Sequence, residues 1–166
     1  PLYVYSRKTL LDHYLKLESA FGQIHPLICY SVKANSNLSI LKALVAKGAG
    51  LDIVSGGELF RALKVGCPAR KIVYASVGKT DKEIVTAISK GIFFFNVESL
   101  AELENINRIS GKLKKITRAA IRINPDVEAK THKYVTTGKI TNKFGIDLNS
   151  AYGILLMRAK FTNLNI

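Results

Sequence analysis

A regular alternation of two kinds of segment constrains the fold of this chain more than any other feature. Segments with apolar residues at helical spacing, several of them ended by a glycine, alternate with short runs of β-forming residues about every 20 to 27 residues. We expect strands over residues 2–5, 27–32, 51–54, 71–76, 92–97 and 118–124. We expect helices over residues 9–21, 37–47, 57–65, 81–90, 100–110 and 148–160, and a further apolar segment over 163–166. Such alternation is typical of a parallel sheet with helical connections, and it predicts an α/β fold.

Two α/β architectures, the doubly wound sheet and the (β/α)8 barrel, share this alternation. No G-x-G-x-x-G motif follows the first predicted strand, although doubly wound dinucleotide-binding folds carry one there. Polar residues recur instead at the carboxyl ends of successive predicted strands, where barrel enzymes place their active sites. These residues are Lys33, Asp52 with Ser55, Ser76, Asn96, and Arg122 with Asn124. We therefore predict a partial (β/α)8 TIM barrel of about five βα units.

We interpret the whole chain, residues 1–166, as one incomplete barrel domain. A barrel needs eight βα units, and Ile166 falls where the sixth strand is expected to begin. Because half a barrel leaves two unpaired sheet edges, we expect the remaining strands, and any further domain, to belong to a longer protein.

Composition and charge bear on the kinds of partner that we expect. The 166 residues are 48% hydrophobic and carry a formal net charge of +13. No apolar run reaches the roughly 18 residues that span a bilayer, and residues 1–17 show no secretory signal, so we expect a cytoplasmic protein without a membrane partner. The positive charge is compatible with nucleic-acid binding, but the lysines are scattered and the densest basic cluster, residues 112–118, contains no aromatic residue. We therefore expect no nucleic-acid partner. The two cysteines and three scattered histidines do not have the spacing of metal ligands, so we also expect no metal site.

Lys33 stands at the end of an apolar predicted strand, over residues 27–32. A lysine that loses hydration there is shifted toward the neutral amine, which forms Schiff bases with carbonyl compounds. The alternative is an ordinary lysine that extends into solvent from a strand end. Asp52 lies inside the next strand, where a carboxylate needs a partner, and Lys33 and Arg122 are the candidates. A structural ion pair and a catalytic one are equally compatible with this pattern.

The connection over residues 126–145 is long and has little periodic pattern, and such loops in compact folds are commonly functional or disordered. Its polar residues, which include His132 and Thr137, suit a flap over a polar substrate. A solvent-exposed loop without that role is an equal alternative.

Three helix starts carry the sequence pattern of a capping box, in which two side chains satisfy backbone groups reciprocally. The pairs are Ser55 with Glu58, Thr80 with Glu83, and Ser99 with Glu102. Gly78-Lys79-Thr80 resembles the end of a P-loop, but residue 73 is a valine where that motif needs glycine. We exclude ATP binding by a P-loop on this ground.

Four motifs together resemble those of the fold-type III pyridoxal phosphate enzymes, which include the alanine racemases and the barrel-type amino-acid decarboxylases. In this order along the chain they closely resemble the diaminopimelate decarboxylases. The motifs are Tyr30-Ser31-Val32-Lys33-Ala34-Asn35, residues 50–58, Arg122-Ile123-Asn124-Pro125, and Thr131-His132-Lys133 with Thr137-Gly138 and Lys143-Phe144-Gly145.

The resemblance implies an alanine-racemase-like barrel in which Lys33 carries pyridoxal 5′-phosphate covalently. It implies that Asp52 and Arg122 lie at the cofactor and that the loop with His132 and Thr137 covers an amino-acid substrate. The implied reaction is decarboxylation of meso-2,6-diaminopimelate to L-lysine and CO2, in lysine biosynthesis. It implies a homodimer whose partner chain completes each site. The resemblance also implies that further site residues, the remaining barrel strands and a carboxyl-terminal β-domain follow Ile166. We therefore expect the 166-residue chain alone to be inactive and to bind the cofactor poorly.

Three alternatives remain open at this point. A related decarboxylase would act on carboxynorspermidine, arginine or ornithine, although the loop pattern of residues 131–145 argues against it. A non-catalytic pyridoxal phosphate-binding protein would keep Lys33 without turnover. A basic nucleic-acid-binding protein would account for the net charge of +13.

Overall fold

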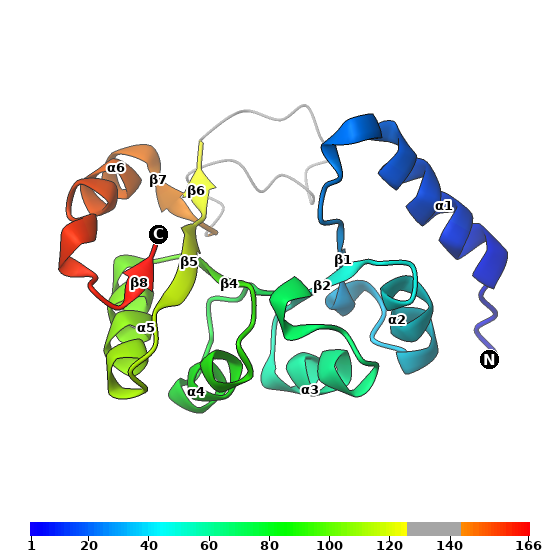
Figure 1. Cartoon of the computed structure of the whole chain (residues 1–166), viewed down its shortest axis with the longest axis horizontal. Coiled ribbons are helices and arrows are strands. Elements are labelled where there is room, and N and C mark those ends of the chain that lie inside the picture. The colour runs from blue at the N-terminus through cyan, green and yellow to red at the C-terminus, as the bar shows by residue number, and fades with distance from the viewer. Residues whose placement is uncertain (126–143) are drawn as a thin grey trace. The chain divides into compact units, whose positions relative to one another are not determined.

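The computed structural model describes residues 1–125 and 144–166. The chain forms two compact units, residues 1–74 and residues 75–166, which we describe in turn (Figure 1). In both units, parallel strands alternate with helices along the chain, as the sequence predicts.

The first unit contains three parallel strands in the order β1-β2-β3. Its elements are α1 (Arg7–Ala20), η1 (Gly22–Ile24), β1 (Cys29–Ser31), η2 (Val32–Ala34), α2 (Leu38–Val45), β2 (Gly50–Ile53), α3 (Gly56–Lys64), η3 (Ala69–Lys71) and β3 (Ile72–Tyr74). The register places Ser31 opposite Asp52, and Asp52 opposite Val73. Helices α2 and α3 lie on the same side of β1 and β2 (Figure 1). The carboxyl ends of the three strands therefore lie at one edge of this sheet.

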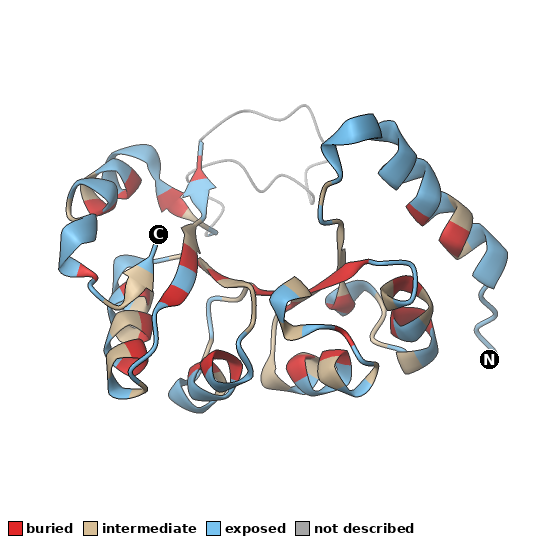
Figure 2. Ribbon diagram, in the orientation of Figure 1, coloured by how far each residue is buried: buried red, intermediate tan, exposed pale blue. Residues whose placement is uncertain are grey.

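The core of the first unit lies between the strands and their helices. Leu51 and Ile53 of β2 and Leu41 of α2 are fully buried, whereas Asp52 between the two strand residues is only half-buried. Figure 2 shows the buried positions along the strands and on the helix faces toward them. Helix α1 packs on α2 through a separate small cluster that includes Leu11 and Tyr14.

Gly50 is required where β2 passes between its two neighbours. A Cβ atom at this position would lie 2.4 Å from the Lys71 carbonyl oxygen and 2.7 Å from the Cys29 Sγ. Because the nearest obstacle is backbone, it cannot move aside as a flexible side chain would. The close approach of three strands at this point therefore excludes any side chain.

The second unit contains the parallel strands β4, β5 and β8 in this order, and a separate parallel pair, β6 and β7. Its elements are α4 (Asp81–Lys90), β4 (Phe94–Val97), α5 (Leu100–Lys112), β5 (Thr117–Ile121), β6 (Ile123–Asn124), β7 (Ile146–Asp147), α6 (Leu148–Leu156), η4 (Arg158–Lys160) and β8 (Leu164–Asn165). Helices α4 and α5 pack against each other. Phe95 and Val97 of β4 and Leu103 of α5 are fully buried and form its core.

Most predicted elements are confirmed, and four expectations need correction. Residues 2–5 form no strand; their side chains are exposed, and β propensity without a neighbouring strand does not fix a strand. The strand expected over 27–32 ends at Ser31, because Val32–Ala34 turn as the 3-10 helix η2. The strand expected over 118–124 is interrupted at Arg122, and the helix expected over 148–160 ends as η4.

The helix caps also differ in one detail from the prediction. Thr80 and Glu83 form the expected capping box. Ser55 and Ser99 cap α3 and α5 through their hydroxyls, but Glu58 and Glu102 accept hydrogen bonds from the N–H groups that precede these caps. The two serines are extended (φ −157° and −158°), whereas Thr80 has φ −79°. This difference in φ accompanies the difference in donor: the glutamate accepts from the N–H of the capping residue at Thr80, and from the N–H of the preceding residue at Ser55 and Ser99.

Candidate functional site

Lys33 lies immediately after the carboxyl end of β1, in the single turn η2. Val32 takes the buried position of this turn, and Lys33 beside it is exposed. The expectation that Lys33 is desolvated on an apolar strand is therefore wrong in this structure. The reason is that β1 ends at Ser31, one residue earlier than predicted, and the chain then turns toward solvent.

The turn after Lys33 is fixed by side chains of the same motif. The Asn35 side-chain oxygen accepts a hydrogen bond from the Asn37 N–H at 3.0 Å. Asn37 then caps α2 by accepting from the Ser39 N–H at 2.9 Å. The small polar residues that follow Lys33 thus lead the chain directly into α2, and they hold the lysine at the edge where the strands end.

Asp52 faces Ser31 across the β1–β2 pair, as their register requires. The Ser31 hydroxyl donates to the Asp52 Oδ2 at 3.2 Å, so a serine is one partner of this carboxylate. The expected ion pair with Lys33 or Arg122 stays a prediction. Burial, and secondarily the Asp52 carboxylate, raise the pKa of the nearby Cys29 thiol. Both effects favour the thiol over the more nucleophilic thiolate at Cys29.

Arg122 occupies the break between β5 and β6 in the second unit. Its N–H donates to the Val97 carbonyl at 2.9 Å, and its carbonyl accepts from the Ile146 N–H at 2.7 Å. Its guanidinium donates to the Glu98 Oε1 at 3.2 Å and lies 5.4 Å from the centre of the Phe144 ring. The side chain is 42% exposed, so it is anchored but accessible.

Gly145 brings the end of the predicted loop against the Arg122 backbone. Its φ is +89°, and an added Cβ would lie 3.0 Å from the Arg122 carbonyl oxygen. Phe144 and Gly145 of the fourth motif therefore support Arg122 of the third. His132 and Thr137 lie outside the described residues, and their expected role stays a prediction.

Sequence reasoning did not predict the contacts of two charged residues of the second unit, Lys79 and Glu98. The Lys79 side chain is fully buried, and its amine donates to the Ser76 and Asn96 carbonyls and to the Glu102 carboxylate. Glu98, the partner of Arg122, is only 4% exposed. The sequence signal for Lys79 was its position directly before the capping residue Thr80 of a predicted helix. The segment Gly78-Lys79-Thr80 was considered only as a possible P-loop and was then excluded.

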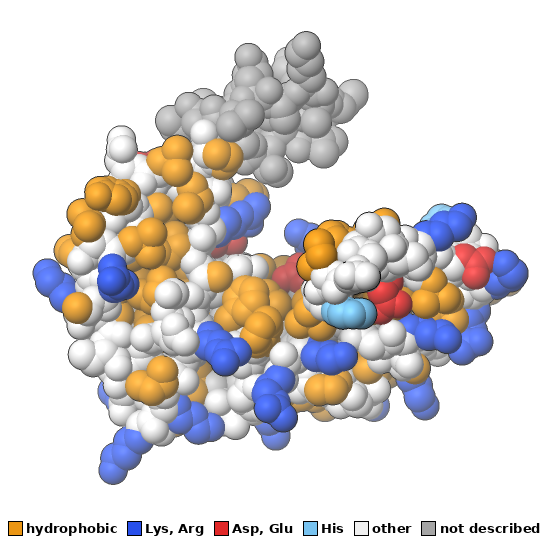
Figure 3. Space-filling view, turned by 45° about the horizontal axis from the view of Figure 1, so that its top comes forward, with side chains coloured by type: hydrophobic (Ala, Val, Ile, Leu, Met, Phe, Trp, Pro, Cys, Tyr) orange, Lys and Arg blue, Asp and Glu red, His pale blue; other side chains and the backbone are white. Residues whose placement is uncertain are grey.

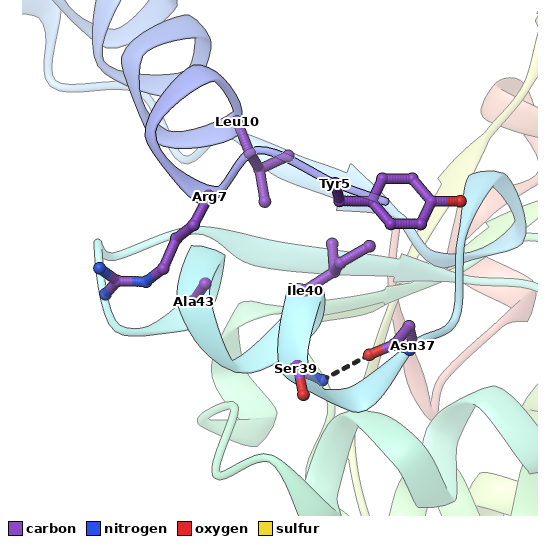
Figure 4. Close-up of a pocket in the computed structure, with 7 residues that line it drawn as sticks. All are labelled: Tyr5, Arg7, Leu10, Asn37, Ser39, Ile40 and Ala43. Atoms are coloured by element: carbon purple, nitrogen blue, oxygen red, sulfur yellow. Dashed lines mark hydrogen bonds between the residues drawn. The ribbon is translucent and has the colours of Figure 1, made fainter. Parts of the chain in front are cut away.

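Two of the cavities in the described part of the chain bear on the location of the site. One, of about 290 Å³, lies between the segment before α1 and helix α2, where Leu10 and Ile40 point toward one another; it contains none of Lys33, Asp52 and Arg122 (Figure 4). The other, of about 500 Å³, is lined by Glu98 and by residues of β7 and α6. The first is not the predicted site, and the second reaches the partner of Arg122.

Metal-binding clusters and membrane-spanning helices are absent from residues 1–125 and 144–166. There, no group of three or more metal-binding side chains occurs, and no helix has the length and apolar character needed to cross a membrane. On the face shown in Figure 3, lysine and arginine side chains are dispersed rather than gathered into one patch.

Comparison with known proteins identifies the family. Residues 7–166 match the family described as pyridoxal-dependent decarboxylase, pyridoxal binding domain. The diaminopimelate decarboxylase of Aquifex aeolicus is 49% identical over 166 residues, which is 100% of this chain and 39% of that protein. The crystal structure of diaminopimelate decarboxylase from Helicobacter pylori complexed with L-lysine is 43% identical, with a TM-score of 0.95 over 99% of this chain and 42% of that one.

A third comparison gives the same result. The diaminopimelate decarboxylase structure from M. jannaschii in complex with L-lysine is 38% identical, with a TM-score of 0.90 over 99% of this chain and 40% of that one. The predicted fold class, α/β with part of an alanine-racemase-like (β/α)8 barrel, is confirmed by these matches, as is pyridoxal phosphate as the cofactor. The chain spans about two fifths of the length of these relatives and belongs to the pyridoxal-dependent decarboxylase family, whose pyridoxal-binding domain it matches.

Proposed function

We propose that the full-length protein decarboxylates meso-2,6-diaminopimelate to L-lysine and CO2, with pyridoxal phosphate on Lys33. One observation carries this proposal: several relatives named diaminopimelate decarboxylase are 42–49% identical to the chain over its whole length. The structures of arginine decarboxylase and lysine/ornithine decarboxylase are only 20–21% identical and support the fold alone.

The residues of the first unit suit a pyridoxal aldehyde chemically. Lys33 presents an exposed primary amine, the group that condenses with an aldehyde once it is neutral. Asp52 places a carboxylate, oriented by Ser31, on the neighbouring strand. When bound, pyridoxal phosphate supplies the electron sink for the bond that breaks. Lys33 would hold it, and the Asp52 carboxylate would orient a cationic or hydrogen-bonding group of the cofactor.

The second unit would contribute the Arg122 guanidinium to the cofactor site and a loop that covers the substrate. Arg122 is anchored through Glu98 and Phe144 and keeps an accessible guanidinium, which suits the binding of polar neighbours of the cofactor. The loop that contains His132 and Thr137 would cover the amino-acid substrate and exclude water. These assignments follow the order of the four motifs along the chain.

The form in which the protein acts is part of the same proposal. Residues 1–166 would be an incomplete barrel domain, completed by further strands and a carboxyl-terminal β-domain. The full-length protein would be a cytoplasmic homodimer in which the partner chain completes each site. Since the chain spans only 39% of the Aquifex relative, residues 1–166 alone are expected to be inactive and to hold the cofactor poorly.

A substrate panel on the full-length protein tests the proposal. Purified protein with pyridoxal phosphate is given meso-diaminopimelate, carboxynorspermidine, arginine or ornithine, and CO2 and the amine product are measured. We expect CO2 and L-lysine from diaminopimelate alone, and none from the Lys33→Ala variant. Release of CO2 from another substrate, or cofactor binding without turnover, would replace the proposed function by one of the alternatives.

A further inference from the structure

Glu98 is a nearly buried carboxylate beside the accessible cation of the site. Its side chain is 4% exposed, and its Oε1 accepts from the Arg122 guanidinium at 3.2 Å. Among residues 1–125 and 144–166, its Oε2 has no hydrogen-bond partner. A carboxylate is costly to bury unless it is paired, so the contact with Arg122 is the main compensation that the described residues provide.

The backbone of Glu98 is itself held in place by a second charged pair. The Glu98 N–H donates to the Glu102 Oε2 at 2.9 Å. The Glu102 Oε1 accepts from the Lys79 Nζ at 2.5 Å, in a pair whose side chains are 13% and 0% exposed. Lys79 also donates to the Ser76 carbonyl at 2.6 Å and to the Asn96 carbonyl at 2.8 Å, which fixes it between two chain segments.

Arg122 therefore makes two hydrogen bonds to the carboxyl end of β4, one from its backbone and one from its side chain. Its backbone N–H bonds the Val97 carbonyl, and its guanidinium bonds the side chain of the next residue, Glu98. The Phe144 ring adds a cation–π contact. A guanidinium has five N–H donors, and one contact to Glu98 leaves the others to be aimed elsewhere. Buried, hydrogen-bonded partners of this kind restrict a functional side chain to one orientation.

We propose that Glu98 is a positioning residue, which fixes the Arg122 guanidinium for the cofactor site, and that Lys79 and Glu102 fix Glu98 in turn. This inference rests on the proposed function, since it concerns how Arg122 serves that site. Each of the two pairs joins one cation to one carboxylate, so loss of the Glu98 charge removes the acidic partner that the described residues give Arg122 and leaves the Phe144 ring as its remaining side-chain contact among them. Glu98→Gln keeps the shape of the side chain and removes only its charge.

The test uses the full-length protein and four variants: Glu98→Gln, Arg122→Gln, the double variant, and Glu104→Gln as a matched control. Glu104 is an exposed residue of α5, the helix that contains Glu102. We measure the dissociation constant for pyridoxal phosphate, the visible circular dichroism of the bound cofactor, and kcat and KM for diaminopimelate. Should Glu98→Gln fail to fold, Glu98→Asp retracts the carboxylate from Arg122 while keeping its charge.

We expect Glu98→Gln to weaken cofactor binding about tenfold and to alter the visible circular dichroism, whereas Glu104→Gln changes neither. Because Glu98 acts through Arg122, the double variant should be no worse than Arg122→Gln alone. Wild-type behaviour of Glu98→Gln in an active enzyme, or losses that multiply in the double variant, would overturn the inference without touching the proposed function. An inactive wild type that binds no pyridoxal phosphate would overturn both.

Discussion

Replacement of Lys79 by methionine should destabilise the second unit far more than loss of an exposed ion pair. Methionine fills similar space but cannot donate to the Ser76 and Asn96 carbonyls or pair with Glu102. Each buried carbonyl that loses its donor costs roughly 1–3 kcal/mol, and breaking a buried pair by removing one partner costs roughly 3–5 kcal/mol in total. Glu102 is 13% exposed and still accepts a hydrogen bond from the Glu98 N–H in this variant. We therefore expect the free energy of unfolding to fall by about 3–4 kcal/mol.

The double variant Lys79→Met with Glu102→Gln separates charge from packing. It removes the unpaired carboxylate, so it should be more stable than Lys79→Met alone by roughly 1–2 kcal/mol. Both are compared by urea unfolding of the full-length protein, followed by far-ultraviolet circular dichroism. The control is Arg108→Met, at an ion pair with Asp81 whose side chains are 47% and 63% exposed; its urea midpoint should stay close to that of the wild type. A Lys79→Met midpoint as high as that of Arg108→Met, or a double variant less stable than Lys79→Met, would refute this account of the cluster.

Three further substitutions and conditions give measurable outcomes. Gly145→Ala, at φ +89° and against the Arg122 carbonyl, should cost roughly 1–3 kcal/mol in thermal unfolding and weaken cofactor binding. Gly50→Ala should cost at least about 3 kcal/mol or prevent soluble expression, because its Cβ would lie 2.4 Å from the Lys71 carbonyl oxygen. Burial raises the pKa of the Cys67 thiol to about 11, so about one thiol in a thousand is ionised at pH 8 and alkylation by iodoacetamide should require unfolding. The folded protein keeps this proton while the unfolded chain releases it, so unfolding free energy should fall as pH rises from about 9 to about 11, and Cys67→Ala should reduce that slope.

The controls for these variants come from the same chain. Gly153 lies in α6 with no atom within 4 Å of an added Cβ and without a positive φ, so Gly153→Ala should keep or raise stability. A Gly145→Ala variant as stable as Gly153→Ala would contradict the claim that the Arg122 backbone leaves no room for a side chain at position 145. Rapid alkylation of Cys67 in the folded protein, with kinetics like those of an exposed thiol, would contradict its burial.

The helices and most strands could be predicted because their signals are local. Ser55, Thr80 and Ser99 each stand at a helix start and cap it as the sequence indicates. Hydrophobic periodicity and the glycines at helix ends supplied the rest. The strand predicted over residues 2–5 is absent because a strand also needs a neighbouring strand to pair with, and β propensity alone does not provide one.

Candidate site residues could be selected from the sequence only where a motif contained them, and their roles stay predictions. Lys33, Asp52 and Arg122 were selected by their place at predicted strand ends and by the resemblance. Glu98 was not, because its contact with Arg122 joins residues 24 positions apart and depends on the break between β5 and β6. Lys79 was weighed against a P-loop, whereas its role depends on partners as distant as Glu102. Contacts of this length follow from the register of strands and helices, which single-residue patterns do not contain.

The central claim is that the Lys33 amine carries the cofactor, and covalent trapping tests it most directly. The full-length protein is incubated with pyridoxal phosphate, reduced with borohydride, digested and mapped by mass spectrometry. We predict stoichiometric phosphopyridoxyl modification of Lys33, its loss in Lys33→Arg, and little stable labelling of residues 1–166 alone. Modification centred on another lysine, or an unlabelled Lys33 in an enzyme that releases CO2 from diaminopimelate, would contradict the account.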